Sequence, residues 1–259
     1  MLEAQLSEAA VMKRVIESIR DLVQNCNFDC SEEGISLQAM DDSHIALVSF
    51  KLYTDAFSTY RCDRNIPLGI NVESLMKVLK SGNNDDVLTL RADDNGSNLN
   101  LIFEDASQDR ISEYNLKLME IEQENMAIPE TEHKVTINMP SAEFQRICRD
   151  MSVLSESVTI EVTKDGVRFS AEGDIGAGSI HLKPKTDLSD DTKSVKVQVE
   201  EPVKLSFNLK YLLFTCKSGS LSNVVTLHMS PDVPIVIKYQ IPAGYVQFFL
   251  APKIEDDEE

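Results

Sequence analysis

The chain contains an internal repeat, and this repeat constrains the fold more than any other feature of the sequence. Segment 71–82 starts with Asn and ends with Lys-Ser-Gly, and segment 208–219, which lies 137 positions later, starts and ends in the same way. A second match lies at an offset of 132 positions, where the apolar residues of 12–22 fall on those of 144–154 and Gly34 falls on Gly166. Two halves that match in order predict a duplicated fold.

Length and composition are compatible with two domains that each bury a core. The chain has 259 residues, of which 42% are hydrophobic, and this is enough for two modest domains. The acidic segment between the halves contains a proline and follows neither the helical nor the strand period, which indicates a connector. We therefore expect an N-terminal domain at 1–117, a connector at 118–134, a C-terminal domain at 135–252 and an acidic tail at 253–259.

Hydrophobic periodicity predicts an α+β fold in which each half contains two similar β-rich units with one helix each. Each half is expected to open with a helix. Helices are predicted at 9–23, 72–80, 141–153 and 208–217. The strands predicted at 111–118 and 175–182 are candidates for sheet edges. The glycine-rich segment 173–178 lacks both the Rossmann order and a following helix, so a turn between strands is expected there.

Several functional classes are disfavoured by the composition. No apolar run reaches the roughly 18 residues that a membrane helix needs, and the first residues do not resemble a signal peptide, so we expect an intracellular protein. The five cysteines are scattered and form no zinc-type cluster with the four histidines, which favours reduced core thiols and no metal. No cofactor is expected. Because no Walker A sequence occurs, any ATP would have to be spent by a separate protein.

The net charge of −18 argues against a nucleic-acid partner until its distribution is considered. The four predicted helices carry nine basic and five acidic residues, a balance of +4, which leaves −22 for the rest of the chain. The basic residues are Lys13, Arg14, Arg20, Lys77, Lys80, Arg146, Arg149, Lys210 and Lys217. Basic residues spaced three or seven apart share one helix face.

A single basic helix face is usually only the solvated side of an amphipathic helix. Four such helices in so acidic a chain favour a cationic surface that contacts a polyanion. Phosphate contacts carry no sequence information directly, and no aromatic stacking platform is apparent. The expected affinity is therefore weak and dependent on salt, and shape would have to retain the polymer.

Longer segments carry a resemblance to a known family. They are 34–48, 60–65, 164–167 and 250–256. The whole chain resembles the proliferating cell nuclear antigens, the sliding clamps of eukaryotes, with a fungal or other non-animal origin. The resemblance implies a nuclear head-to-tail homotrimer, with two domains per chain and with helices around duplex DNA. It also implies roles in tethering replicative polymerases and in DNA repair, including translesion synthesis and mismatch repair.

The resemblance also implies positions for functional residues. The DNA contacts would be the nine helix residues together with Arg61 and Arg64, and Lys164 matches the lysine to which ubiquitin is attached. The groove for a partner peptide with aromatic anchors would comprise Met40, His44, Ile45, Leu47, Met126, Ile128, Pro129, Pro234, Phe249, Ala251 and Pro252. The implied partners are double-stranded DNA, further copies of the chain, replicative DNA polymerases, the clamp loader replication factor C, flap endonuclease, DNA ligase and other proteins with a clamp-binding peptide. No membrane partner is implied.

The sequence also departs from the family pattern in places. Phe249 stands where the family often has Tyr, segment 242–245 is one residue shorter than in animal relatives, and loop 184–193 diverges. These departures affect loop contacts rather than the fold.

Alternative interpretations remain open at this point. By spacing alone, Met40, Ile45 and Leu47 are ordinary strand-core residues. Segment 41–44, Asp-Asp-Ser-His, contains the residue types of a hydrolase triad, but adjacent residues rarely face one another and no Gly-x-Ser-x-Gly elbow occurs. A closer alternative to the replication clamp is a subunit of a heterotrimeric checkpoint clamp.

Overall fold

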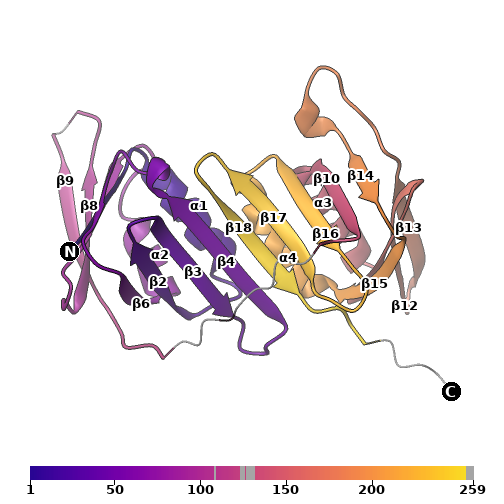
Figure 1. Cartoon of the computed structure of the whole chain (residues 1–259), viewed down its shortest axis with the longest axis horizontal. Helices are drawn as coiled ribbons and strands as arrows, with labels where there is room; N and C mark the ends of the chain where they lie inside the picture. Colours follow the sequence, from indigo (N-terminus) through magenta and orange to yellow (C-terminus); the bar gives the residue numbers. More distant parts are fainter. Residues whose placement is uncertain (108, 123–125, 127–131, 255–259) are drawn as a thin grey trace. The chain divides into compact units, whose positions relative to one another are not determined.

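A computed structural model describes residues 1–107, 109–122, 126 and 132–254 (Figure 1). The chain forms two compact units. Among the described residues, unit 1 comprises 1–42, 48–126 and 241–246, and unit 2 comprises 43–47, 132–240 and 247–254. Each unit thus includes one short segment from the other half of the sequence. The predicted domain boundaries remain a prediction, and parts of the predicted connector and tail lie outside the described residues.

Unit 1 contains two helices and two groups of strands. Its helices are α1 (Ala9–Ile19) and α2 (Val72–Leu79), and a short 3₁₀ turn, η1, spans Thr54–Ala56. One sheet has the order β5-β1-β7-β8-β9, and the second group has the order β4-β3-β2-β6. The strands are β1 (Leu2–Leu6), β2 (Asn25–Ser31), β3 (Gly34–Met40), β4 (Ala46–Tyr53), β5 (Thr59–Cys62), β6 (Ile66–Asn71), β7 (Val87–Ala92), β8 (Asn98–Glu104) and β9 (Ile111–Lys117).

Unit 2 repeats this plan. Its helices are α3 (Ser141–Ser152) and α4 (Leu209–Thr215), with 3₁₀ turns η2 (Asp191–Lys193) and η3 (Cys216–Ser220). One sheet has the order β13-β12-β11-β15, and the other strands have the order β14-β10-β16-β17-β18. The strands are β10 (Val135–Pro140), β11 (Ser157–Thr163), β12 (Gly166–Gly173), β13 (Gly176–Leu182), β14 (Lys196–Val199), β15 (Val203–Asn208), β16 (Val224–Met229), β17 (Ile235–Ile241) and β18 (Gly244–Leu250). The predicted α+β fold class is confirmed.

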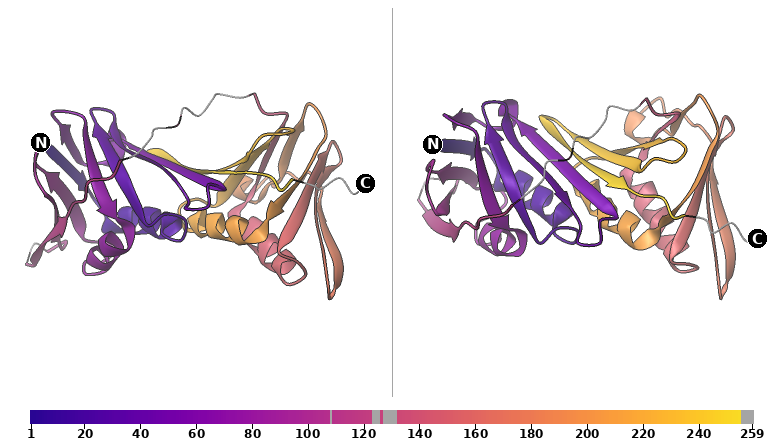
Figure 2. Two further views of the ribbon diagram at one scale, coloured as in Figure 1. Left: turned by 90° about the horizontal axis from the view of Figure 1, so that it is seen from below. Right: turned by 60° about the horizontal axis from the view of Figure 1, so that its bottom comes forward.

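The two helices of each unit pack against each other and lie together on one side of that unit's strands (Figure 2). In α1 the apolar residues recur every three or four positions, and Met12, Ile16 and Ile19 have no exposed surface. Phe144 and Ile147 are buried in the same way in α3. Because one face of each helix is buried, its charged residues must lie on the other face.

The repeat extends to individual hydrogen bonds. In both units the first amide of each helix donates to a backbone carbonyl that lies just before a strand, and all four bonds are 2.8 or 2.9 Å long. The bonds are Ala9 N to Asp86 O, Ser141 N to Asn223 O, Val72 N to Gln24 O and Leu209 N to Glu156 O. These partners differ between the units by the same offsets of 132 and 137 positions that relate the sequences. The duplication therefore preserves the way in which each helix start is held.

Two features differ from the sequence prediction. Each half begins with a strand, β1 or β10, whereas the periodicity predicts a helix at the start. These strands are short, and their alternation of buried and half-buried residues is a weaker signal than the helical pattern that follows. Two predicted helices are also too long: the helix predicted at 9–23 ends at Ile19, and the helix predicted at 208–217 ends at Thr215, where a 3₁₀ turn follows. The glycine-rich segment 173–178 forms the turn between β12 and β13, as predicted.

Glycine is required at the equivalent turns that begin β3 and β12. Gly34 has a φ of 133° and Gly166 has a φ of 138°, values that L side chains rarely adopt. A Cβ on Gly34 would lie 2.0 Å from the Leu52 carbonyl oxygen, and one on Gly166 would lie 2.1 Å from that of Leu182. Both the backbone angle and the close approach of a neighbouring strand therefore exclude a side chain.

We predict that Gly166→Ala destabilises the protein much more than Gly176→Ala does. Gly176 has a similar φ of 141°, but a Cβ there would meet no atom within 4 Å. Gly176→Ala should therefore cost only backbone strain, about 1 kcal/mol, whereas Gly166→Ala adds a clash and should cost about 2–4 kcal/mol. Urea unfolding of both variants tests this, and equal losses would contradict the role of the Leu182 carbonyl.

Candidate functional site

The basic residues of α1 differ in how they are held. The Lys13 ammonium donates to the Gly82 carbonyl oxygen at 2.7 Å and to Asn84 Oδ1 at 3.1 Å. Partial burial lowers the pKa of Lys13. Lys13 therefore links α1 to the loop after α2, so this predicted DNA contact also has a structural role. Arg14 is exposed, and its side chain forms no ion pair within the described part of the chain.

Three other predicted contacts pair with acids on or next to their own helices. Arg20 lies 3.0 Å from Glu17, Lys77 lies 2.7 Å from Glu73, and the side chain of Arg146 pairs with an acid one turn further along α3. The side chains of Lys77 and Arg146 are 71% and 73% exposed. Exposed pairs of this kind contribute little to stability, so a phosphate can replace the carboxylate.

The remaining helix residues leave positive charge at the surface. Lys80 and Arg149 are exposed, and their side chains make no ion pair with any described residue. The Lys210 ammonium lies 5.8 Å from the ring centre of Phe214. Lys217 lies on η3, is half-buried and interacts with other groups of the protein. Each unit therefore presents basic side chains on its packed helix pair, which is the arrangement that a phosphate backbone needs.

Arg61 and Arg64 do not lie on a helix. Arg61 is on β5, an end strand of its sheet, and Arg64 is in the turn that follows. The Arg61 guanidinium donates to both carboxylate oxygens of Asp63, at 2.8 and 3.2 Å. Hydrogen bonding to this carboxylate raises the pKa of Arg61 and lowers the pKa of Asp63. The structure does not place these two residues on the helix surface, and their role in DNA binding remains a prediction.

Two strands end their sheets as predicted from the sequence. β9 pairs only with β8, and β13 pairs only with β12, within the described residues. Each outer edge therefore presents unpaired backbone N–H and C=O groups. Ile111 at the start of β9 is 63% exposed, and Ile175 next to β13 is 72% exposed. Large apolar side chains beside unpaired backbone indicate surfaces that a second chain can cover.

The residues predicted for the peptide groove divide between the two units. In unit 2 the Ala251 amide donates to the Ile45 carbonyl oxygen at 3.1 Å, which places these two predicted residues side by side. Ile45 is 38% exposed, but Leu47 is 7% exposed and is a core residue of β4. The strand-core interpretation thus fits Leu47, whereas Ile45 is accessible. His44, just before Ile45, has a φ of 56°, in the left-handed region that few residues other than glycine adopt.

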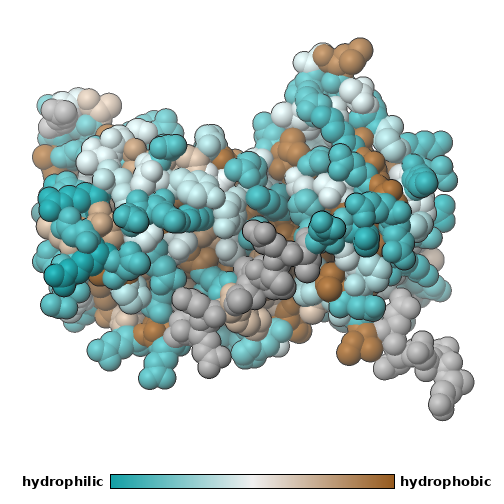
Figure 3. All heavy atoms as spheres, viewed as in Figure 1, coloured by the Kyte–Doolittle hydropathy of each residue, from teal (hydrophilic) through white to brown (hydrophobic). Residues whose placement is uncertain are grey.

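Most of the other groove residues are accessible. Pro234 and Ala251 are exposed, and Phe249 and Pro252 are half-buried. In unit 1, Met40 is half-buried and Met126 is 40% exposed. Ile128 and Pro129 lie outside the described residues. The face seen in Figure 3 is mostly hydrophilic, and hydrophobic residues reach it only in separate places.

Met126 is held by a residue that the sequence analysis does not single out. The Met126 amide donates to Gln38 Oε1, and the Gln38 side-chain amide donates to the Met126 carbonyl oxygen, each at 2.8 Å. Gln38 lies on β3, two residues before Met40. No pattern in the sequence links Gln38 to a segment 88 residues away, so this contact is found only in the structure.

Lys164 and four of the five cysteines occupy the environments expected of them. Lys164 is exposed in the turn between β11 and β12. The described cysteines have free thiols, and all except the half-exposed Cys62 are buried. Burial raises the pKa of the Cys26 thiol to about 12, so this thiol is unreactive. No described group of three or more His, Cys, Asp or Glu side chains is arranged to hold a metal, and none of the described helices could cross a membrane.

Comparison with known proteins identifies the family. Residues 1–126 match the N-terminal domain model of proliferating cell nuclear antigen, and residues 127–254 match its C-terminal domain model. The chain belongs to the proliferating cell nuclear antigen family. It is also 54% identical, over 259 residues and the whole length of both chains, to the proliferating cell nuclear antigen of the fungus Chaetomium thermophilum.

Family membership settles the general function. The chain is a DNA sliding clamp and a processivity factor for DNA polymerases, with roles in replication and repair. The resemblance seen in the sequence is therefore confirmed. The comparisons support this replication clamp and give no support to the checkpoint-clamp alternative.

We predict that Arg149→Ala weakens binding to duplex DNA, whereas Arg168→Ala does not. Both changes remove one exposed arginine, but Arg149 lies on α3 and Arg168 lies on the strand β12. The Arg149→Ala variant should bind DNA about threefold more weakly at low salt. The slope of log K against the logarithm of the salt concentration should become less negative by about one for each phosphate contact that is lost. Fluorescence anisotropy at several salt concentrations measures both quantities. Equal effects of the two variants would show that only net charge matters.

Proposed function

We propose that the clamp is a head-to-tail homotrimer in which β9 of one chain pairs with β13 of the next. The proposal is supported by the two sheet edges, which lie in different units and have unpaired backbone groups within the described chain. Pairing two different edges is a heterologous contact, and such contacts generate rings when the rotation closes. The exposed side chains of Ile111 and Ile175 would be covered at this joint.

Duplex DNA passes through this ring and contacts the basic residues of α1 to α4. The observation that carries this proposal is the placement of exposed basic side chains on the packed helices of both units. Several of these side chains are already balanced by weak pairs with neighbouring acids, for example Lys77 with Glu73. Contacts of this kind can exchange from phosphate to phosphate, so they allow sliding. Encirclement rather than affinity then keeps the clamp on DNA, and the clamp itself catalyses no reaction.

Partner proteins dock through a short peptide with aromatic anchors. This proposal is supported in unit 2 by the exposed residues Ile45 and Ala251, which lie side by side, and in unit 1 by the partly exposed residues Met40 and Met126. The proposed partners are replicative polymerases, the clamp loader, flap endonuclease and DNA ligase. The proposed location is the nucleus, and Lys164 is the proposed site of ubiquitin attachment.

We predict that the assembled clamp is retained on circular DNA but lost from linear DNA. A ring held by topology slides off free ends, whereas contacts that grip the backbone hold both forms equally. The clamp is loaded with a clamp loader and ATP onto nicked circles, which are then cut once or left uncut and passed through a gel-filtration column. Blocking both ends of the linear DNA with bound protein should restore retention. Equal retention on the cut and uncut DNA would contradict encirclement.

We predict that Ile45→Ser weakens partner-peptide binding about tenfold or more, because an apolar contact of this size is worth at least about 1.4 kcal/mol. Val153→Ser serves as the matched control, since Val153 is 69% exposed in the same unit but lies at the end of α3. Isothermal titration with a peptide that carries the aromatic anchors gives both affinities. An unchanged affinity for Ile45→Ser would exclude this residue from the groove.

A further inference from the structure

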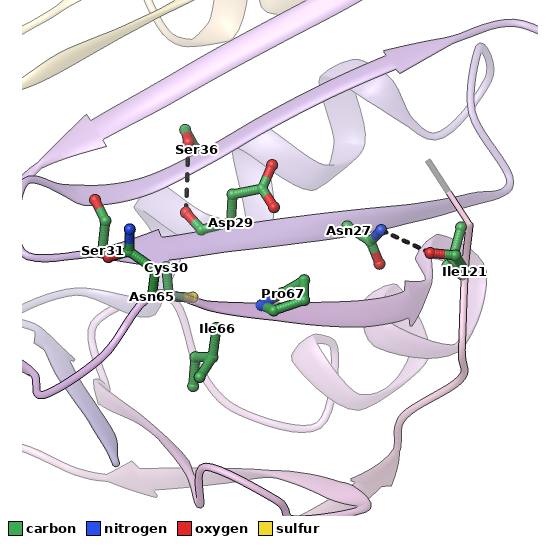
Figure 4. Close-up of a pocket in the computed structure, with 9 residues that line it drawn as sticks. All are labelled: Asn27, Asp29, Cys30, Ser31, Ser36, Asn65, Ile66, Pro67 and Ile121. Atoms are coloured by element: carbon green, nitrogen blue, oxygen red, sulfur yellow. Dashed lines mark hydrogen bonds between the residues drawn. The ribbon is translucent and has the colours of Figure 1, made fainter. Parts of the chain in front are cut away.

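A polar cavity of about 560 Å³ on unit 1 has no role in the sites described above. It is lined by outward-facing residues of β2, by residues of β3 and of the edge strand β6, and by Ile121 at the start of the connector (Figure 4). Asn27 forms one side of the cavity, and its side-chain amide donates to the Ile121 carbonyl oxygen at 3.0 Å. This bond fixes the connector at the rim.

Asp29 supplies the carboxylate of this cavity. In the register of the strands it lies between Ser36 on β3 and Pro67 on β6. The Ser36 hydroxyl donates to the backbone carbonyl of Asp29, not to its carboxylate. The carboxylate has no hydrogen bond or ion pair with any described residue. Burial raises the pKa of the Asp29 carboxyl, and no neighbouring cation opposes this effect.

The equivalent position in unit 2 has two basic neighbours that the Asp29 position in unit 1 lacks. At the repeat offsets, Asp29 corresponds to Glu161, and its two neighbours correspond to Arg168 and Lys204. In unit 2, Glu161 lies in register between Arg168 on β12 and Lys204 on β15. The same position in the sheet therefore has a cation on each side in unit 2 and none in unit 1. No ion pair joins Glu161 to either residue within the described part of the chain, so the two units differ in which residue types flank the carboxylate in register.

We propose that this cavity binds the ammonium or guanidinium group of a lysine or arginine side chain carried by a partner protein. A single carboxylate at the surface attracts a free cation only weakly in water. A cation that is tethered to an already bound segment has a high effective concentration, so the same contact becomes significant. A protein side chain is therefore favoured over a free polyamine.

The predicted peptide groove supplies the tether, and in this respect the inference rests on the proposed function. Along β3, Ser36, Gln38 and Met40 point to the same face of the sheet. Ser36 lines the cavity, Gln38 holds Met126, and Met40 belongs to the predicted groove. Ser36 and Met40 are about 13 Å apart at the rise of a strand. Roughly four extended residues would carry a basic side chain from the groove to Asp29.

The first test uses labelled peptides that contain the aromatic anchors, extended at either end by a four-residue Gly-Ser spacer and then by lysine or by norleucine. For one of the two ends, the end whose extension reaches Asp29, the lysine peptide should bind the wild-type protein roughly fivefold more tightly than the matching norleucine peptide. Asp29→Asn should abolish this difference. Ser36→Arg should also abolish it, because the variant supplies the cation of unit 2. Glu120→Gln, which removes an equal charge from the exposed connector, should preserve it.

Three outcomes of this test would overturn the proposal. The first is equal binding of the lysine and norleucine peptides to the wild-type protein. The second is an equal loss in Asp29→Asn and Glu120→Gln, which would indicate the general acidic field. The third is that spermidine raises the Tm of the wild type but not of Asp29→Asn while the lysine extension has no effect, since a free polyamine would then be the ligand.

A second measurement does not depend on the groove. Because the folded-state pKa of Asp29 is raised, its ionised form destabilises the native state above that pKa, and protonation removes the penalty as the pH falls. Asp29→Asn and Ser36→Arg should therefore each raise the Tm at pH 7, and the gain from Asp29→Asn should shrink as the pH is lowered. Glu120→Gln should leave the Tm unchanged. If the peptides fail to bind but these Tm gains appear, the proposed peptide groove is wrong, whereas the Asp29 carboxylate is still a half-buried acid without a cation. If the Tm gains are absent, the proposed cation site itself is wrong.

Discussion

The burial of one face of each helix is the constraint on which the rest of the structure depends. Side chains such as Ile16 on α1 and Ile147 on α3 are almost fully buried, so the charged residues of these helices can lie only on the opposite face. In a chain with a net charge of −18, an excess of basic residues on these faces separates the charges in space. The hydrophobic effect thus fixes where the basic side chains lie that we propose to face DNA.

Under the proposed function, the contacts of the basic residues explain how the clamp holds DNA without gripping it. Lys13 is engaged with the loop after α2, and Lys77 is paired with Glu73. These side chains are therefore partly compensated before DNA arrives. Each exchange of a carboxylate for a phosphate gains little free energy, and this keeps the barrier between neighbouring DNA positions low. Retention must then depend on a closed ring, which links the helix surface to the two sheet edges.

Much of the fold follows from the sequence, because the repeat and the 3.6-residue period are strong signals. The four helices, the edge strands at 111–117 and 176–182 and the turn at 173–176 are all predicted within a few residues. The short strands β1 and β10 are missed because five or six alternating residues carry little information. The burial of Leu47 and the contact of Gln38 with Met126 depend on packing between distant segments, which spacing does not encode. The cavity at Asp29 is an intermediate case, since the repeat could have shown its missing cations once the strand register was known.

The two edges differ in sequence and lie in different units, and this has a genetic consequence. In the proposed head-to-tail ring every joint uses one β9 and one β13. A chain with a defect in only one of these strands would still pair normally through its other edge. It would therefore be incorporated into trimers, and the joint at its altered edge would fail to close. In a cell that makes normal and altered chains in equal amounts, most trimers would contain at least one altered chain. Mutations at either edge should therefore behave as dominant traits, whereas mutations that prevent folding should be recessive.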